Sequence, residues 1–171
     1  MISDFLPVVP TVCAASAERL PEGKYVIRPL NHRQGQEFRI TEDQRDFNPN
    51  TEYCSLFIPK TKEFRIIYYK GRRVCTYLKK TPEESFSPEQ PWTFSNGCRF
   101  LTIANPESND RILRTSLYQE LDNHWITKAA HLIAVDVLWK NPTAYICEIN
   151  FAPGLTIAST FDKIKSIQDA L

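Results

Sequence analysis

The sequence predicts an α+β protein in which β-hairpins form antiparallel sheets and the helices come as separate segments. β-rich runs flank short turn sequences in residues 24–40, 63–78 and 132–149, a pattern that predicts hairpins. Apolar residues recur at helical spacing in residues 113–129 and again in residues 161–171. Hairpins and separate helices of this kind together indicate the α+β class.

The size and charge of the chain limit what it can be. Its 171 residues suffice for one domain with a sizeable core, and we expect two small lobes, approximately residues 1–50 and 51–171. With 21 basic and 20 acidic residues the net charge is +1, so no overall field favours nucleic acid or an anionic membrane. Nucleic acid is therefore not expected as a partner, although the hairpin at residues 72–80 is locally basic.

The cysteines are scattered and include no CxxC pair: Cys13, Cys54, Cys75, Cys98 and Cys147. An odd number in this arrangement indicates reduced, buried thiols and not a disulfide framework or a zinc site. No apolar run is long enough to span a membrane, and the N-terminus lacks the features of a signal peptide. We therefore expect a cytoplasmic protein.

Two β-rich runs near the N-terminus, residues 24–28 and 37–40, flank a polar loop. If they pair as a hairpin, Arg28, His32 and the backbone amides around Gly35 could hold an anion at the hairpin tip. The alternative is that this tip is an ordinary solvated turn.

The segments around this hairpin are predicted from their prolines and polar residues. Pro7 and Pro10 interrupt residues 5–12, which favours an edge strand or an extended arm. Residues 41–51 are polar and acidic, and we expect them to be the junction between the lobes. Residues 52–58 form a short strand candidate.

A second hairpin is predicted for residues 63–78, with Gly71 in its turn. Glu63 and Arg65 share one face of the first strand, and Lys79 follows the second strand. An acid placed beside an arginine can hold that arginine toward a phosphate. The alternative is an ion pair on the surface.

The hairpin predicted for residues 132–149 carries the strongest functional signal. Glu148 and Asn150 are two residues apart and share a strand face, and pairing across the turn brings Asp136 near them. Oxygen ligands on one sheet face suit Mg²⁺, particularly when phosphate supplies the remaining ligands. The alternative is that Asp136 and Glu148 pair with buried arginines, because buried carboxylates are costly when unpaired.

Two helical regions complete the chain. A helix-start signal at residues 105–110 precedes one long helix, or two with a break near residues 121–123. His124 and His131 fall in this region and are expected to be surface or packing residues. Residues 159–171 read as a closing amphipathic helix.

Val-Asp in residues 134–138, followed across the turn by Glu-Ile-Asn-Phe-Ala-Pro-Gly at residues 148–154, is a specific combination. Together with the order of the preceding segments, it resembles the ATP-grasp fold over roughly residues 24–158. The resemblance is to carboxylate–amine ligases of the glutamate-ligase and D-alanine–D-alanine-ligase type, and closest to small ATP-grasp proteins of phage genomes. It implies two lobes, each with an antiparallel sheet and helices, and a nucleotide cleft between them.

The resemblance also implies cofactors and roles. ATP and Mg²⁺ would be the cofactors, with Asp136, Glu148 and Asn150 as metal ligands. Arg28, His32, Gly35, Phe57 and Glu63 would bind the nucleotide, and Arg65, Lys79 and Asn96 would line the site of phosphoryl transfer.

The implied activity is ligation of a small-molecule or peptide carboxylate to an amine through an acylphosphate. Three departures from the family pattern favour alternatives to this activity. The expected preceding domain is absent, and the phosphate loop has a single glycine. The short segment of residues 41–51 replaces the helix that the family usually has between the phosphate loop and the hinge. A homodimer or a partner protein would then replace the missing domain. The alternatives are an inactive binding or inhibitor protein acting on a host protein, and a reaction that stops at phosphoryl transfer.

Overall fold

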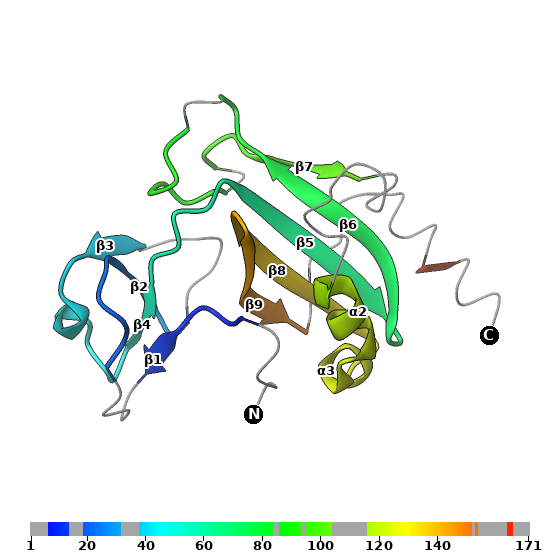
Figure 1. Ribbon diagram of the computed structural model, residues 1–171, viewed down its shortest axis with the longest axis horizontal. Coiled ribbons are helices and arrows are strands. Elements are labelled where there is room, and N and C mark those ends of the chain that lie inside the picture. Colours follow the sequence, from blue (N-terminus) through cyan, green and yellow to red (C-terminus); the bar gives the residue numbers. More distant parts are fainter. Residues whose placement is uncertain are drawn as a thin grey trace.

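Two antiparallel sheets lie side by side in the computed structural model (Figure 1). The structure describes residues 7–13, 19–31, 38–83, 86–93, 95–103, 116–151, 153 and 164–165. The α+β prediction is confirmed. The predicted phosphate loop, the start of the first helical region and nearly all of the closing helix lie outside these ranges.

The smaller sheet has the strand order β1-β4-β2-β3. Its strands are β1 (Thr11–Cys13), β2 (Tyr25–Pro29), β3 (Arg39–Thr41) and β4 (Glu52–Leu56). The predicted hairpin of β2 and β3 is present, with Val26 opposite Ile40. The N-terminal segment supplies the edge strand β1, as its prolines predicted. Val12, Tyr25, Ile27 and Cys54 form the core of this sheet.

The larger sheet has the strand order β7-β6-β5-β8-β9. Its strands are β5 (Lys62–Tyr69), β6 (Arg72–Lys80), β7 (Arg99–Thr102), β8 (Leu132–Lys140) and β9 (Thr143–Asn150). Both predicted hairpins are confirmed, as β5–β6 and β8–β9. In the first turn, Gly71 has a φ of +74°, a left-handed conformation that glycine adopts at little cost.

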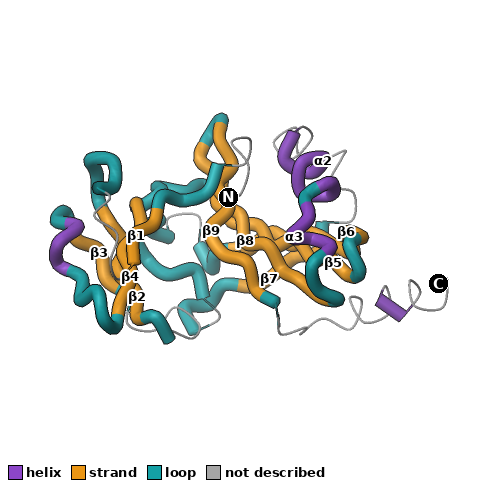
Figure 2. The backbone as a smooth tube through the Cα atoms, turned by 90° about the horizontal axis from the view of Figure 1, so that it is seen from below, coloured by secondary structure: helices purple, strands orange, loops and turns teal. Residues whose placement is uncertain are grey.

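Two helices, α2 (Ser116–Asn123) and α3 (Trp125–Lys128), cover one face of the larger sheet (Figure 2). Of the two arrangements predicted, the described residues show the broken one, with the break at His124. This histidine caps α3, since its Nδ1 accepts a hydrogen bond from the Ile126 N–H at 3.2 Å. His131 is exposed, as expected of a surface residue.

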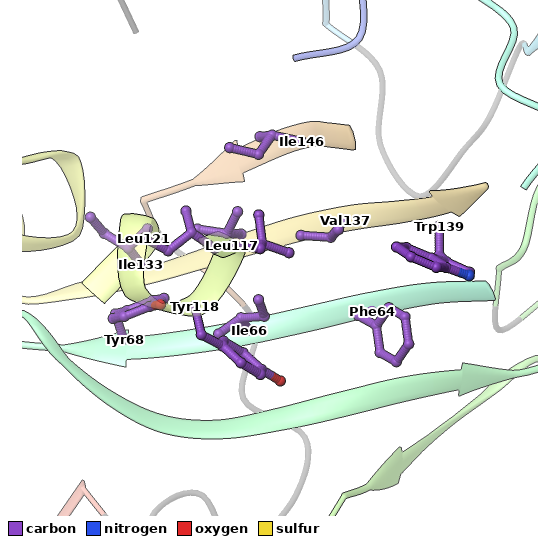
Figure 3. Packing of buried hydrophobic residues seen from close by; sticks show 11 residues of the cluster. Phe64, Ile66, Tyr68, Leu117, Tyr118, Leu121, Ile133, Val137, Trp139 and Ile146 are labelled. Carbon is purple, nitrogen blue, oxygen red and sulfur yellow. The ribbon is translucent and has the colours of Figure 1, made fainter. Parts of the chain in front are cut away.

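Strand alternation gives the larger sheet one apolar face toward α2. Leu117, Tyr118 and Leu121 of the helix pack there against the sheet (Figure 3). The sheet side of this cluster consists of Phe64, Ile66, Tyr68, Ile133, Val135, Val137, Trp139 and Ile146. The intervening residues of the same strands, including Glu63, Arg65 and Asp136, therefore point to the opposite face.

The prediction that residues 41–51 connect the two lobes is wrong. This segment joins β3 to β4 within the smaller sheet and contains a 3-10 turn at Gln44–Asp46. β4 pairs with both β1 and β2, so the change of sheet follows Leu56. Polar residues of the segment bond to one another, as in the Arg45–Asp43 ion pair. The connection between the sheets is instead residues 57–61.

The N-terminal segment bridges the two sheets. The Ile146 N–H of β9 donates to the Pro7 carbonyl at 2.8 Å, and the Leu56 N–H of β4 donates to the Pro10 carbonyl at 2.9 Å. These contacts fix how the sheets meet on either side of the connection.

The cysteines are all free thiols, as predicted, but not all are buried. Cys54, Cys75 and Cys98 are buried, whereas Cys147 is half-buried and Cys13 is exposed. In the described ranges, no helix is both long and apolar enough to cross a membrane.

Candidate functional site

The polar face of the larger sheet borders a cleft of about 670 Å³ between the two sheets. The smaller sheet contributes β2 and β4, all five strands of the larger sheet contribute, and residues 88–93 form a further wall. Five cationic side chains and three acidic ones line it: Arg28, Lys60, Arg65, Lys79 and Arg99 against Glu63, Asp136 and Glu148. The cleft therefore carries an excess of positive charge and favours an anionic ligand.

Most of the predicted site residues meet in this cleft. Those that line it are Arg28, Phe57, Glu63, Arg65, Lys79, Asp136, Glu148 and Asn150. Asn96 does not line it: this residue is exposed in a turn, and its side-chain N–H donates to the Pro91 carbonyl at 2.8 Å. His32 and Gly35 lie outside the described residues.

The hairpin register brings the predicted metal ligands to one face. Asp136 lies directly opposite Glu148, and Ala134 lies opposite Asn150. A β-bulge then shifts the pairing, so that Val137 faces Ile146 and Cys147 is the extra residue. The three oxygen-bearing side chains therefore share the cleft face, although the described residues contain no cluster of three or more His, Cys, Asp or Glu side chains that could hold a metal.

Asp136 is paired with an arginine. This is one of the two arrangements that the sequence left open for its carboxylate. The Arg65 Nε and Nη2 atoms donate to the two Asp136 carboxylate oxygens, each at 2.6 Å. Burial opposes the charge of Arg65, but the hydrogen bonds and charge of Asp136 outweigh it and raise the guanidinium pKa. The arginine alternative therefore applies to Asp136, whereas Glu148 is exposed.

Glu63 is buried between two lysines. Its Oε2 lies 2.7 Å from the Lys60 Nζ, and its Oε1 contacts the Lys79 Nζ. Burial alone would raise the Glu63 pKa, but the two ammonium groups outweigh it and lower the pKa of the carboxyl. The carboxylate is therefore charged at neutral pH, with both oxygens occupied by lysine.

Arg28 lines the cleft from β2 of the smaller sheet. Its guanidinium lies 5.6 Å from the centre of the Phe38 ring, and its buried Nε has no hydrogen-bond partner in the described structure. Burial opposes its charge, but the charges of Cys147, Tyr53 and Glu148, with a hydrogen bond to Tyr53, outweigh it and raise the Arg28 pKa. A half-buried cation whose buried Nε has an unused donor is suited to an anionic oxygen.

Among the cleft residues that were not predicted as site residues are Lys60, Trp92 and Phe100. The Lys60 Nζ atom lies 4.9 Å from the centre of the Trp92 ring. The Arg65 Cζ atom and the Lys79 Nζ atom lie 5.0 Å and 5.4 Å from the centre of the Phe100 ring. The position of Lys60, three residues before Glu63, is a signal in the sequence that could have predicted their ion pair. The contact between Lys60 and Trp92 could not be predicted, because it forms only when distant segments fold together.

No protein-family model matches the chain, and no curated protein matches it. A solved structure of D-alanine–D-alanine ligase from Bacillus anthracis with ATP matches with a TM-score of 0.61 at 17% identity, covering 96% of this chain and 56% of that one. The chain has the ATP-grasp fold.

Other ligases of known structure resemble this ATP-grasp chain. An L-amino acid ligase from Bacillus licheniformis has a TM-score of 0.55 at 16% identity, covering 91% of this chain and 38% of that one. The ATP-grasp ligase PsnB, complexed with a precursor variant, Mg and ADP, has a TM-score of 0.59 at 11% identity, covering 97% and 54%. The chain thus spans about half of the length of the D-alanine–D-alanine ligase, and the likeness concerns the fold.

Proposed function

We propose that the protein is an ATP- and Mg²⁺-dependent ligase that joins a carboxylate to an amine. The observation that carries the proposal is the charged cleft between the two sheets of an ATP-grasp fold, with Asp136, Glu148 and Asn150 on one wall. Solved structures with the same fold include ligases crystallised with ATP or with Mg and ADP.

In this proposal ATP lies between the sheets. Phe57, in the connection, would contact the adenine, and Arg28 and Lys79 would contact the phosphates from opposite walls. The predicted contributions of His32 and Gly35 remain part of the proposal, whereas Asn96 is not included, because it does not line the cleft. The cations of the cleft would stabilise the charge that develops on the transferred phosphoryl group, because they are held in place before reaction.

The chemistry would proceed in two displacements. An oxygen of the substrate carboxylate attacks the γ-phosphorus, the bond from that phosphorus to the β–γ bridging oxygen breaks, and ADP leaves. The amine then attacks the acyl carbon of the acylphosphate, inorganic phosphate leaves, and the nitrogen loses a proton. Closure of the cleft would exclude water, which otherwise hydrolyses the acylphosphate.

The residues on the β8–β9 face fit Mg²⁺. They provide two carboxylates and an amide oxygen, which are hard donors, and phosphate oxygens can complete the shell. Each carboxylate oxygen has two lone pairs, so Asp136 retains acceptor capacity beside Arg65. Bound there, Mg²⁺ would neutralise phosphate charge and act as a Lewis acid.

A second candidate is a binding or inhibitor protein that has the ATP-grasp fold but no turnover. The observation in its favour is that Asp136 and Glu63 are already neutralised by cations of the same chain. Such pairing gives the cleft a stable arrangement without nucleotide. Phage origin and a cytoplasmic location remain part of both proposals.

Calorimetric titration with Mg-ATP, followed by assay of ADP release with pools of amino acids and short peptides, tests these proposals. The ligase predicts binding, ADP release, and a product whose mass equals carboxylate plus amine minus water. Binding without ADP release for any pool would favour the inactive protein. ADP release with a phosphorylated product would favour phosphoryl transfer alone.

A further inference from the structure

Lys60 lies in the connection between the two sheets and lines the cleft. Its side chain is only 12% exposed, although lysine is seldom covered to this degree without a partner. Two contacts hold it: the Glu63 Oε2 atom at 2.7 Å and the face of the Trp92 ring at 4.9 Å. The position of its ammonium group is therefore set by the fold.

The charges around Glu63 do not cancel. One carboxylate is shared by two ammonium groups, Lys60 on one oxygen and Lys79 on the other. The group of three therefore keeps one unit of positive charge on the cleft wall. The neighbouring pair of Arg65 and Asp136 is neutral by comparison.

Among the residues that the structure describes, the two ammonium groups also have unused donors. Each carries three N–H donors, and the contact with Glu63 uses one of them. The rings of Trp92 and Phe100 lie against Lys60 and Lys79 respectively. An aromatic face attracts a cation but leaves its N–H groups without a true acceptor, so each ammonium can still donate to a ligand.

We propose that Lys60, Glu63 and Lys79 form one anion-binding unit, in which Lys60 contacts the ligand directly and Glu63 positions both ammonium groups. The unit takes one anionic oxygen group. Within the proposed ligase function on which the identity of the ligand rests, that group is either a phosphate of ATP or the carboxylate of the substrate.

Substitution of Lys60 tests the unit. Lys60→Met removes the charge but keeps a similar length, and Lys60→Arg restores the charge. Lys80→Met is the matched control, because Lys80 is exposed at the end of β6 and does not line the cleft. Thermal unfolding of each variant establishes that it is folded.

Two probes distinguish the sources of the anion: inorganic triphosphate titrated by calorimetry, and succinate titrated by NMR. We expect Lys60→Met to weaken one of them about tenfold or more, the size of a lost charge-assisted hydrogen bond. Lys60→Arg should recover much of that loss, and Lys80→Met should bind as the wild type does.

The affected probe identifies the source. Weaker triphosphate binding assigns the unit to a phosphate, and weaker succinate binding assigns it to the substrate carboxylate. Unchanged binding of both probes by folded Lys60→Met would overturn the proposal, as would a wild-type protein that binds neither. A wild-type protein that binds triphosphate but does not bind Mg-ATP would instead refute the proposed ligase function.

Discussion

Arg65 on β5 and Asp136 on β8 lie opposite each other, and their side chains form two hydrogen bonds of 2.6 Å each. The side chain of Asp136 is 10% exposed and that of Arg65 is 21% exposed. Two parallel hydrogen bonds between one guanidinium and one carboxylate fix both side chains in orientation as well as in distance. Asp136 is thereby held in a defined position on the wall where the metal ligands are proposed.

Asp136→Asn should destabilise the protein and abolish ATP turnover. Loss of one partner from a buried pair costs about 3–5 kcal/mol, and the partial exposure of Arg65 reduces the expected loss in free energy of unfolding to about 1–3 kcal/mol. Urea unfolding measures this value. The double variant Arg65→Met with Asp136→Met should recover part of it, because no unpaired charge remains; additive losses would show that the pair is not coupled.

Glu148→Gln should separate stability from ligand binding. Glu148 is exposed, and it interacts with Arg28 and Arg65 through charge. Loss of an exposed charge should change the free energy of unfolding by no more than about 0.5 kcal/mol. Loss of a proposed metal ligand should weaken Mg-ATP binding about tenfold or more, whereas ATP binding without Mg²⁺ should change little. Equal losses with and without Mg²⁺ would argue against the metal role.

The sequence predicted the hairpins well because their signals are local. Alternating apolar residues and a turn suffice to predict the β8–β9 hairpin, but the register that the turn sets pairs Val137 with Ile146 and, carried one residue further, would place Asp136 across from Cys147. The β-bulge at Cys147 has no such signal. It shifts the pairing by one residue, and this shift places Glu148 across from Asp136 on the same face of the sheet.

The division between the sheets was harder to predict. Residues 41–51 have the composition of a linker, but strand pairing decides the matter: β4 lies between β1 and β2 and completes the smaller sheet. Partners distant in sequence were likewise not predictable. The choice of Arg65 as the partner of Asp136 depends on β5 pairing with β8, and the contact between Lys60 and Trp92 depends on the path of residues 86–93.

Leu121→Ala should destabilise the fold through the larger sheet. Leu121 is fully buried where α2 packs on the sheet (Figure 3). Removal of a buried leucine side chain costs about 2–5 kcal/mol, because it loses apolar burial and leaves a cavity. Urea unfolding should show this loss. Trp125→Ala, at an exposed site on α3, is the control and should lower the free energy of unfolding much less. Equal losses for the two variants would contradict the packing of Leu121 between α2 and the sheet.

Glu63→Gln should change how stability depends on pH. The folded pKa of Glu63 is lowered from its ordinary value of 4.5 because Lys60 and Lys79 outweigh the effect of burial. A lowered folded pKa means that its contribution is complete above the unfolded pKa and is lost as pH falls through the folded value. The wild type should therefore be more stable than Glu63→Gln at pH 7.

The difference between the two proteins should shrink below about pH 4.5, because protonated Glu63 is as neutral as glutamine. Asp43 and Glu52, whose pKa values are each about 2, titrate in both proteins and cancel in the comparison. Urea unfolding from pH 3 to 7 gives the two curves. Parallel curves over this range would mean that the lysines do not stabilise the Glu63 carboxylate, and the anion-binding unit would lose its central contact.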